Sequence, residues 1–272
     1  KAGDRGQGAL AEVWEEKGVH FCAPRIIATG EAENTVIHAT GPGQIVLPDG
    51  PKDEKAIVKY EGDAEYRELP HRTGRAVFNK NVVMLRQANG MVVRGDQMEA
   101  YVEADPASKE PVDPEANKGL PRRLRRNVVR GNVIVTQGQR VAYGTVGDLL
   151  VRSNGDVIRL QGAKKRPARV RDREGLHLYA PGITVLESTG VVTASGAGRM
   201  YVTSTEPLQQ VGVEAEEGRS QEVNYLVLYD GEMKYNSLAR KVKFRDNVRL
   251  EQENVWGRCE RLILSLKEVE GE

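Results

Sequence analysis

The chain has 272 residues, enough for one large domain or two medium ones with a substantial core. Hydrophobic residues make up 39% of it and aromatic residues only 5%, so the core must consist mainly of Val, Leu, Ile and Met, which favours a thin, strand-rich protein over a globule. The 40 Lys and Arg residues nearly balance the 39 Asp and Glu residues, and a net charge of +1 excludes a general attraction to nucleic acid or to an anionic membrane.

Four short blocks predict strands in the first part of the chain. They are GVHFCAPRI at 18–26, HATGPGQIVL at 38–47, YEGDAEY at 60–66 and FNKNVVML at 78–85. In the last block, Val82 and Met84 alternate with their neighbours and therefore share one face of a strand. Gly, Asn, Asp and Pro recur about every 8–12 residues along the chain, which is typical of many short strands joined by turns.

A proline-rich stretch follows at 106–124. Its prolines lie among charged and small residues, a composition typical of a linker or a long loop. Directly after it, VRGNVIVTQG at 129–138 and GDLL at 147–150 repeat the last block and the GDQM sequence that follows it at 95–98. This extra copy has no counterpart at the end of the chain.

The four blocks return in the same order in the second part of the chain. They are GLHLYAPGI at 175–183, TASGAGRMYV at 193–202, YDGEMKY at 229–235 and FRDNVRLE at 244–251. Because Arg249 and Glu251 must be solvated, the face with Val248 and Leu250 must be the buried one. Four matched blocks in one order indicate a duplication, so we expect a first unit at 1–105, a linker or long loop at 106–124 and a second unit at 125–272.

The pattern between the strands predicts the fold class. The chain lacks amphipathic segments of about 10–15 residues between its strands, which argues against α/β folds and leaves sandwiches, barrels, jelly rolls and β-solenoids. Repeated strands with a single apolar face favour an elongated stack in which each hairpin covers its neighbour. We therefore expect an all-β protein, a solenoid-like stack of short antiparallel strands.

At these residues the chain resembles the LptA/OstA-like lipopolysaccharide-transport family. That family repeats a strand of the form Gly/Asn, Val, polar, apolar, polar, Gln, which RGNVIVTQG at 130–138 closely matches, and an aromatic-rich step similar to YDGEMKY at 229–235. Its members are twisted β-jelly rolls that hold lipopolysaccharide acyl chains in an apolar groove and join edge to edge into a periplasmic bridge. The resemblance therefore implies two tandem OstA-like units, a periplasmic location and transport toward the outer membrane, with no enzyme activity and no cofactor.

The resemblance also implies partners and a lipid site. The partners would be lipopolysaccharide or another acylated lipid and other Lpt-type β-jelly-roll proteins, added by edge-strand pairing or end-to-end stacking, with no role for nucleic acid. The groove would be lined by the inward faces of the strands: Val82, Met84, Met98, Val133, Val135, Leu150, Met200, Val202, Val248, Leu250 and Leu262. Ordinary core packing is the alternative interpretation of each of these residues, and the two are compatible. Burial contributes about 0.8 kcal/mol per CH₂, so aliphatic walls can hold acyl chains without specific contacts.

Two basic stretches are further candidates. In PRRLRRN at 121–127, the arginines could pair with headgroup phosphates: Arg122, Arg123, Arg125 and Arg126. AKKRPARVRDR at 163–173 is the second stretch, and it lacks the interleaved aromatic residues of single-strand nucleic-acid sites. A solvated surface is the simpler interpretation of both.

Neither the histidines nor the cysteines predict a metal or catalytic site. His20 and His177 occupy equivalent places in the repeat, but no carboxylate or second His repeats beside them at metal spacing, so we expect a structural role and no metal. Cys22 and Cys259 are too few for a disulfide framework and replace other residues of the repeat, so we expect them to pack. No catalytic triad or repeated carboxylate pair stands out, and we expect no enzyme.

Three functions are compared on this basis. The first is the lipid bridge, and the second is a structural β-solenoid scaffold that polymerises end to end without lipid. The third is a carbohydrate-active β-helix enzyme, which needs a cluster of carboxylates on one exposed face, whereas the acidic positions vary between the copies.

The chain begins at Lys1 rather than Met, which indicates processing or trimming and leaves room for a secretory signal. No apolar run approaches the roughly 18 residues of a membrane-spanning helix.

Overall fold

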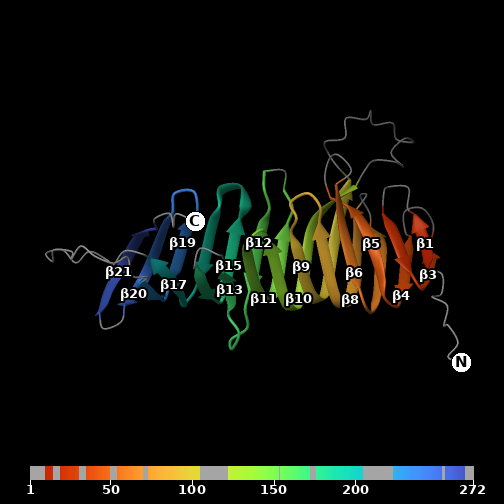
Figure 1. Ribbon diagram of the computed structural model, residues 1–272. Coiled ribbons are helices and arrows are strands. Elements are labelled where there is room, and N and C mark those ends of the chain that lie inside the picture. The colour runs from red at the N-terminus through yellow and green to blue at the C-terminus, as the bar shows by residue number, and fades with distance from the viewer. Residues whose placement is uncertain are drawn as a thin grey trace, which may run out of the picture. The chain divides into compact units, whose positions relative to one another are not determined.

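The computed structural model shows an all-β protein (Figure 1). It describes residues 10–14, 19–30, 35–49, 54–69, 73–104, 122–152, 154–171, 176–204, 223–252 and 255–266. These residues form one large antiparallel sheet of 21 strands with a ring of hydrogen bonds within it, and contain one short 3₁₀ turn and no α-helix. The expected fold class is therefore confirmed at the level of an all-β, antiparallel protein. In the described residues, no helix is both long and apolar enough to cross a membrane.

The chain divides into two compact units. The first comprises Lys1–Gly138 and Val146–Arg152, and the second comprises Gln139–Thr145 and Ser153–Glu272. Residues 106–121 of the predicted linker lie outside the described residues, and its last three residues begin a long strand, β10.

Two ladders build the first unit. Its strands are β1 (Ala11–Trp14), β2 (His20–Ala23), β3 (Arg25–Thr29), β4 (Val36–Thr40), β5 (Gly43–Pro48), β6 (Lys55–Tyr60), β7 (Asp63–Leu69), β8 (Thr73–Arg86), β9 (Val92–Ala104) and β10 (Arg122–Gln137). One ladder runs β1, β2, β5, β6 and joins the second half of β8, whereas the other runs β3, β4, β7 and joins its first half. The long strands β9 and β10 follow alongside β8.

The second unit repeats this pairing scheme. It contains part of β11 (Arg140–Leu150), then β12 (Val157–Gln161), β13 (Ala168–Arg171), β14 (His177–Ala180), β15 (Gly182–Leu186), β16 (Val191–Ser195), β17 (Gly198–Ser204), β18 (Val223–Tyr229), β19 (Glu232–Asn236), β20 (Lys241–Gln252) and β21 (Val255–Ser265). One ladder runs β13, β14, β17, β18 to the second half of β20, and the other runs β12, β15, β16, β19 to its first half. β21 pairs along β20 as β9 pairs along β8.

Each long strand turns a corner where it passes from one ladder to the other. In β8 the corner lies at Lys80 and Asn81, with φ of 67° and 49°, and in β20 it lies at Asp246 and Asn247, with φ of 65° and 48°. Asn tolerates this left-handed conformation better than most residues, and the strand register shifts at both places, as at a β-bulge. The repeated Asn-Val sequence is therefore a corner followed by a strand.

The corner asparagines are held by carboxylates. The side-chain amide of Asn81 donates to Glu61 at 2.7 Å, and the amide of Asn247 donates to Asp230, the residue that matches Glu61 in the repeat. In β10, Asn132 has a φ of 45° and donates to Asp96 at 2.9 Å. The same contact thus fixes the bend of three long strands.

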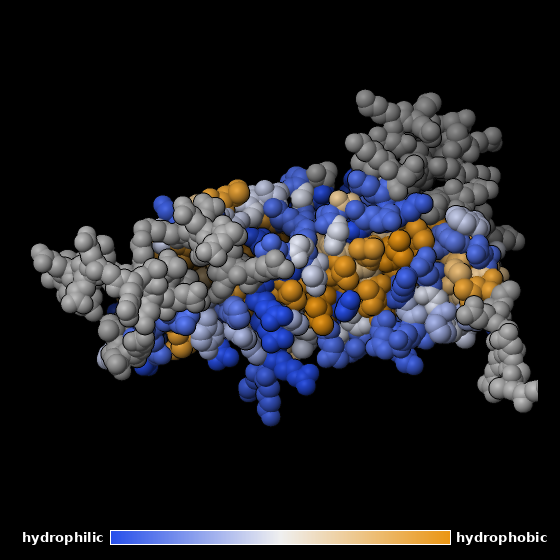
Figure 2. All heavy atoms as spheres, in the orientation of Figure 1, coloured by the Kyte–Doolittle hydropathy of each residue, from blue (hydrophilic) through white to orange (hydrophobic). Residues whose placement is uncertain are grey.

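The core of each unit lies between its ladders. In the first unit, Phe21 from one ladder meets Tyr66 from the other in an edge-to-face contact, with ring centroids 5.7 Å apart. All five methionines of the chain are fully buried: Met84, Met91, Met98, Met200 and Met233. On the face that Figure 2 shows, apolar residues form a broad patch over the region of β5, β6, β8 and β9, and hydrophilic residues surround it.

Candidate functional site

The interior of the two units contains most of the predicted groove-lining residues. Eight of them are buried, each with at most 6% of its surface exposed: Val82, Met84, Met98, Val133, Val135, Met200, Val202 and Val248. They belong to β8, β9 and β10 in the first unit and to β17 and β20 in the second. The inward faces of these strands are therefore aliphatic and methionine-rich.

The other three predicted lining residues are half-buried. In β11 the buried neighbour is Leu149 rather than Leu150, so the alternation is one residue out of phase with the prediction. Leu250 lies opposite the fully buried Val227, and Leu262 lies opposite the buried Phe244, so both lie on the inner face. Their partial exposure contrasts with Val248, which lies two residues before Leu250 on the same face of β20 and is fully buried.

One polar side chain in the interior was missed by sequence reasoning. Asn127 is fully buried, and its amide nitrogen lies 3.1 Å from the sulfur of Met84 and 3.3 Å from that of Met98. Its carbonyl oxygen has no hydrogen-bond partner among the described residues. The pairing of β9 with β10 shifts register between Leu124 and Arg126, which changes the face on which the following residues lie. The sequence carries no clear signal for that shift.

A buried ion pair links the end of β5 to the end of β8. Asp49 follows β5 and accepts two hydrogen bonds from Nε of Arg86, at 2.9 and 3.1 Å. Each of these residues is only 3% exposed. A buried charge requires such a partner, because an unpaired one would be strongly desolvated.

Two of the arginines predicted to contact phosphate pair with the protein's own carboxylates. Arg126 donates two hydrogen bonds to Asp148, at 2.8 and 3.1 Å, and these bonds to the carboxylate raise the pKa of Arg126. Arg125 lies 3.3 Å from Glu103. Arg123 is half-buried, and the side chain of Arg122 lies outside the described residues.

Three of the four histidines and both cysteines lie among the described residues. The His20 ring stacks on Trp14 with centroids 3.6 Å apart, and it lies 3.6 Å from Glu12. His177 is exposed on β14, and both Cys22 and Cys259 are free thiols. Within the described ranges, no group of three or more His, Cys, Asp or Glu residues could hold a metal ion.

The fold and the interior define an antiparallel all-β protein in which two bent, two-ladder units enclose aliphatic cores. No protein-family model matches the sequence, and no curated protein matches it.

Proposed function

We propose that the protein binds the acyl chains of a lipid between its ladders and serves as a periplasmic bridge that carries lipopolysaccharide toward the outer membrane. In this proposal each unit is a twisted β-jelly roll of the OstA-like kind, and the protein transports its ligand without a chemical reaction. The observation that supports it best is the composition of the interior, where every methionine of the chain is buried among Val, Ala and Leu. Methionine side chains adapt to irregular and changing apolar partners.

The pairing scheme supports lipid entry between the ladders. In the described part of the first unit, the ladder with β5 and β6 and the ladder with β4 and β7 are hydrogen-bonded to each other through β8. Separating them away from β8 therefore disturbs side-chain packing and leaves the backbone ladders intact. An inserted acyl chain replaces that packing and contributes about 0.8 kcal/mol per buried CH₂.

Photo-crosslinking tests the proposal. A photoreactive amino acid at Leu250, on the inner face and half-buried, is expected to crosslink to lipopolysaccharide, and the same substitution at the neighbouring exposed Arg249 serves as the control. Mass spectrometry of lipids extracted from the purified protein provides the second measurement. Equal crosslinking at both positions, or no acylated lipid in the extract, would contradict lipid binding in the interior.

A structural scaffold is the second candidate, and the last strand favours it. β21 pairs with β20 on one side, and in the described residues no strand pairs with its other side. It also exposes Trp256 and Ile263, 68% and 62% of whose surfaces are accessible. An open, partly apolar edge can add a strand from another molecule. Filaments formed by lipid-free protein in electron micrographs would favour the scaffold over the lipid bridge.

A further inference from the structure

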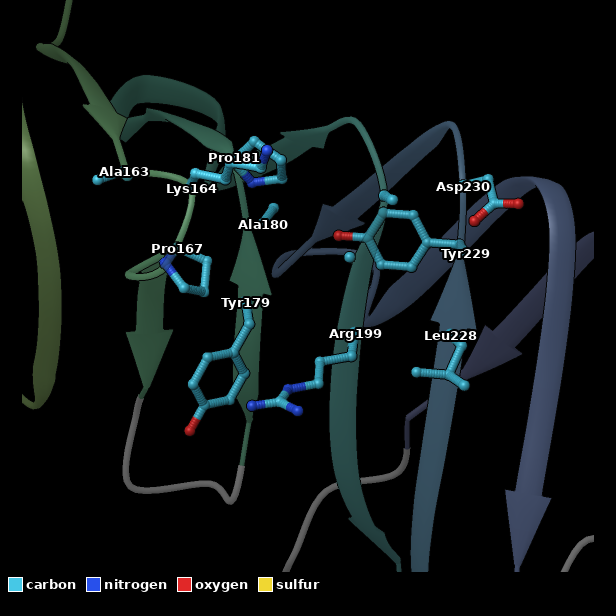
Figure 3. A pocket seen from close by; sticks show the side chains of 13 residues that line it. Ala163, Lys164, Pro167, Tyr179, Ala180, Pro181, Arg199, Leu228, Tyr229 and Asp230 are labelled. Carbon is cyan, nitrogen blue, oxygen red and sulfur yellow. The ribbon is translucent and has the colours of Figure 1, made fainter.

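A pocket of about 710 Å³ lies on the second unit, over the outward face of β14, β17 and β18 (Figure 3). Its walls include Pro181, Leu228 and the turn between β12 and β13, and Lys164 and Arg199 contribute cations. Tyr179 is also part of the lining, and its outward position is set by the burial of its neighbours in β14. The pocket is therefore lined by outward residues of these strands together with the buried Ala180 and Tyr229.

Arginines and tyrosines alternate across the strands at this pocket. Tyr143, Arg169, Tyr179 and Arg199 lie directly opposite one another on β11, β13, β14 and β17. The guanidinium carbon of Arg169 lies 3.8 Å from the ring centre of Tyr143, and that of Arg199 lies 4.7 Å from the ring centre of Tyr179. Stacking on a ring restrains a guanidinium group while its N–H groups stay free to form hydrogen bonds.

The cations of this face have no acidic partners within the described part of the chain. Arg169, Arg171 and Arg199 form no ion pair with a described carboxylate, in contrast to Arg126 and Arg130, which pair with Asp148 and Glu99. The turn between β12 and β13 adds three exposed cations: Lys164, Lys165 and Arg166. This turn projects from the surface as a hydrophilic cluster (Figures 1 and 2). Among the described residues of the lining, Asp230 is the one carboxylate, and it accepts a hydrogen bond from Asn247. The cations around the pocket outnumber it and would favour an anionic ligand.

A buried hydroxyl group lies at the floor of the pocket. Tyr229 is 1% exposed, and its hydroxyl oxygen has no hydrogen-bond partner among the described residues. Its ring extends toward Ala180 and the pocket (Figure 3). The hydroxyl of Tyr60, its counterpart in the first unit, is likewise buried without a partner among the described residues, so the unpaired hydroxyl is common to both units. In the second unit it lies at the pocket, where a ligand atom that accepts its hydrogen bond would be favoured.

The first unit shows that the fold does not require this arrangement. Cys22 holds the place of Tyr179, and Gln44, opposite Cys22, holds the place of Arg199. Lys59, opposite Gln44, holds the place of Leu228. The same ladder therefore forms without the arginine and tyrosine side chains, and their presence in the second unit needs another reason.

We propose that this pocket binds a phosphate ester, with the phosphate against Arg199 and Lys164 and the organic part against Pro181 and Leu228. Guanidinium groups match the oxygens of phosphate in bidentate geometry. The guanidinium groups already cover faces of the tyrosine rings, which disfavours base stacking and hence single-stranded nucleic acid. Lys164 and Arg199 are both exposed on the outward face, so phosphate binding through them can be tested separately from acyl-chain binding in the interior.

Titration of the full chain with small probes tests the proposal. Glycerol phosphate is expected to bind at low salt in calorimetry, with uncharged glycerol as the negative control. Arg199→Gln, which copies Gln44 of the first unit, is expected to weaken the affinity about tenfold or more. Lys59→Gln removes an exposed cation from the first unit and is expected to leave the affinity unchanged. Undetectable binding of glycerol phosphate, or equal affinity of Arg199→Gln and the unmodified chain, would overturn the site.

Vesicles distinguish the two sources of the phosphate ester. If the ligand is a lipid headgroup, the protein floats with phosphatidylcholine vesicles that contain phosphatidic acid, and Arg199→Gln reduces flotation. If the ligand is a soluble ester, glycerol phosphate binds through Arg199 and flotation does not depend on phosphatidic acid. Crosslinking of lipopolysaccharide at Leu250 is expected to be the same in Arg199→Gln, so failure of one site is distinguishable from failure of the other.

Discussion

The ring of Tyr229 lies across the strand from Gly198 so closely that a Cβ atom on Gly198 would be 2.4 Å from the tyrosine hydroxyl. Tyr60 and Gly43 repeat this relationship in the first unit, also at 2.4 Å. The tyrosine thus fills the space that the glycine leaves open on its strand. Burial is the main cause that raises the pKa of Tyr60, to about 12, and it also raises the pKa of Tyr229.

Gly198→Ala is expected to destabilise the protein by about 1–3 kcal/mol, because the added methyl group overlaps the Tyr229 hydroxyl. Denaturant unfolding measures the change. Gly257→Ala is the matched control, since a Cβ atom there would have nothing within 4 Å. Equal stability of the two variants would show that the tyrosine moves aside without cost.

The corner of β20 predicts different effects of two substitutions at Asn247. Asn247→Ala loses the hydrogen bond to Asp230. It also puts a residue without a short polar side chain into the left-handed conformation, which Asn tolerates better than Ala. The variant is therefore expected to cost about 1–2 kcal/mol of stability. Asn247→Gly loses the hydrogen bond but accepts the conformation, so it is expected to cost less. Thermal unfolding of both variants measures the difference, and the opposite ranking would contradict the role of the backbone conformation.

Removal of one partner of the buried ion pair is expected to be severe. Arg86→Met leaves Asp49 buried without its arginine, which is expected to cost about 3–5 kcal/mol. The double variant with Asp49→Leu removes both charges and is expected to be more stable than Arg86→Met alone. A double-mutant cycle in denaturant provides the measurement, and additive losses would show that the two side chains act independently.

Glu99 predicts a dependence of stability on pH. Burial raises the pKa of Glu99, but hydrogen bonds from Tyr101 and Arg75 outweigh it and lower the pKa below its ordinary value. The ionised carboxylate is thus favoured in the folded state, so its contribution is present above the unfolded pKa near about 4.3 and is lost as the pH falls through the folded pKa. Glu99→Gln is expected to lower stability by about 1–2 kcal/mol at neutral pH.

Unfolding of Glu99→Gln and the unmodified chain across acidic pH tests that expectation. The difference between them is expected to shrink as the pH falls below the ordinary carboxyl range. Glu65→Gln, which removes an exposed carboxylate near Arg67, is the control and is expected to change stability by less than about 1 kcal/mol. A Glu99→Gln effect that persists unchanged in acid would contradict the role of ionisation.

The strands and their inward faces could be predicted because alternation leaves a clear pattern. Val82, Val133 and Val248 all lie where the alternation places them, at 0–1% exposure. Leu150 does not. Its strand has apolar residues at two successive positions, Leu149 and Leu150, and alternation alone does not tell which of the two faces inward. Asn127 was missed because a register shift, which depends on the partner strand, decides the face on which it lies.

The pocket of the second unit could not be predicted from the sequence, because its residues come from strands that are far apart in the chain. The basic stretch at 163–173 has no aromatic residues of its own, and Tyr143 and Tyr179 come to it from neighbouring strands. The carboxylate partners of the other basic stretch likewise come from β9 and β11, as Glu103 and Asp148. The pairing of the strands, rather than the neighbouring residues in the sequence, thus decides which arginines and lysines form ion pairs.

The left-handed corners of the long strands have an implication for how the two copies can diverge. Each corner ties the geometry of a unit to one asparagine and one acid, and the inward face of each strand occupies only alternate positions. The remaining positions are free to vary without altering the architecture. The two units use equivalent outward positions differently: the second carries Tyr179 and Arg199 where the first carries Cys22 and Gln44.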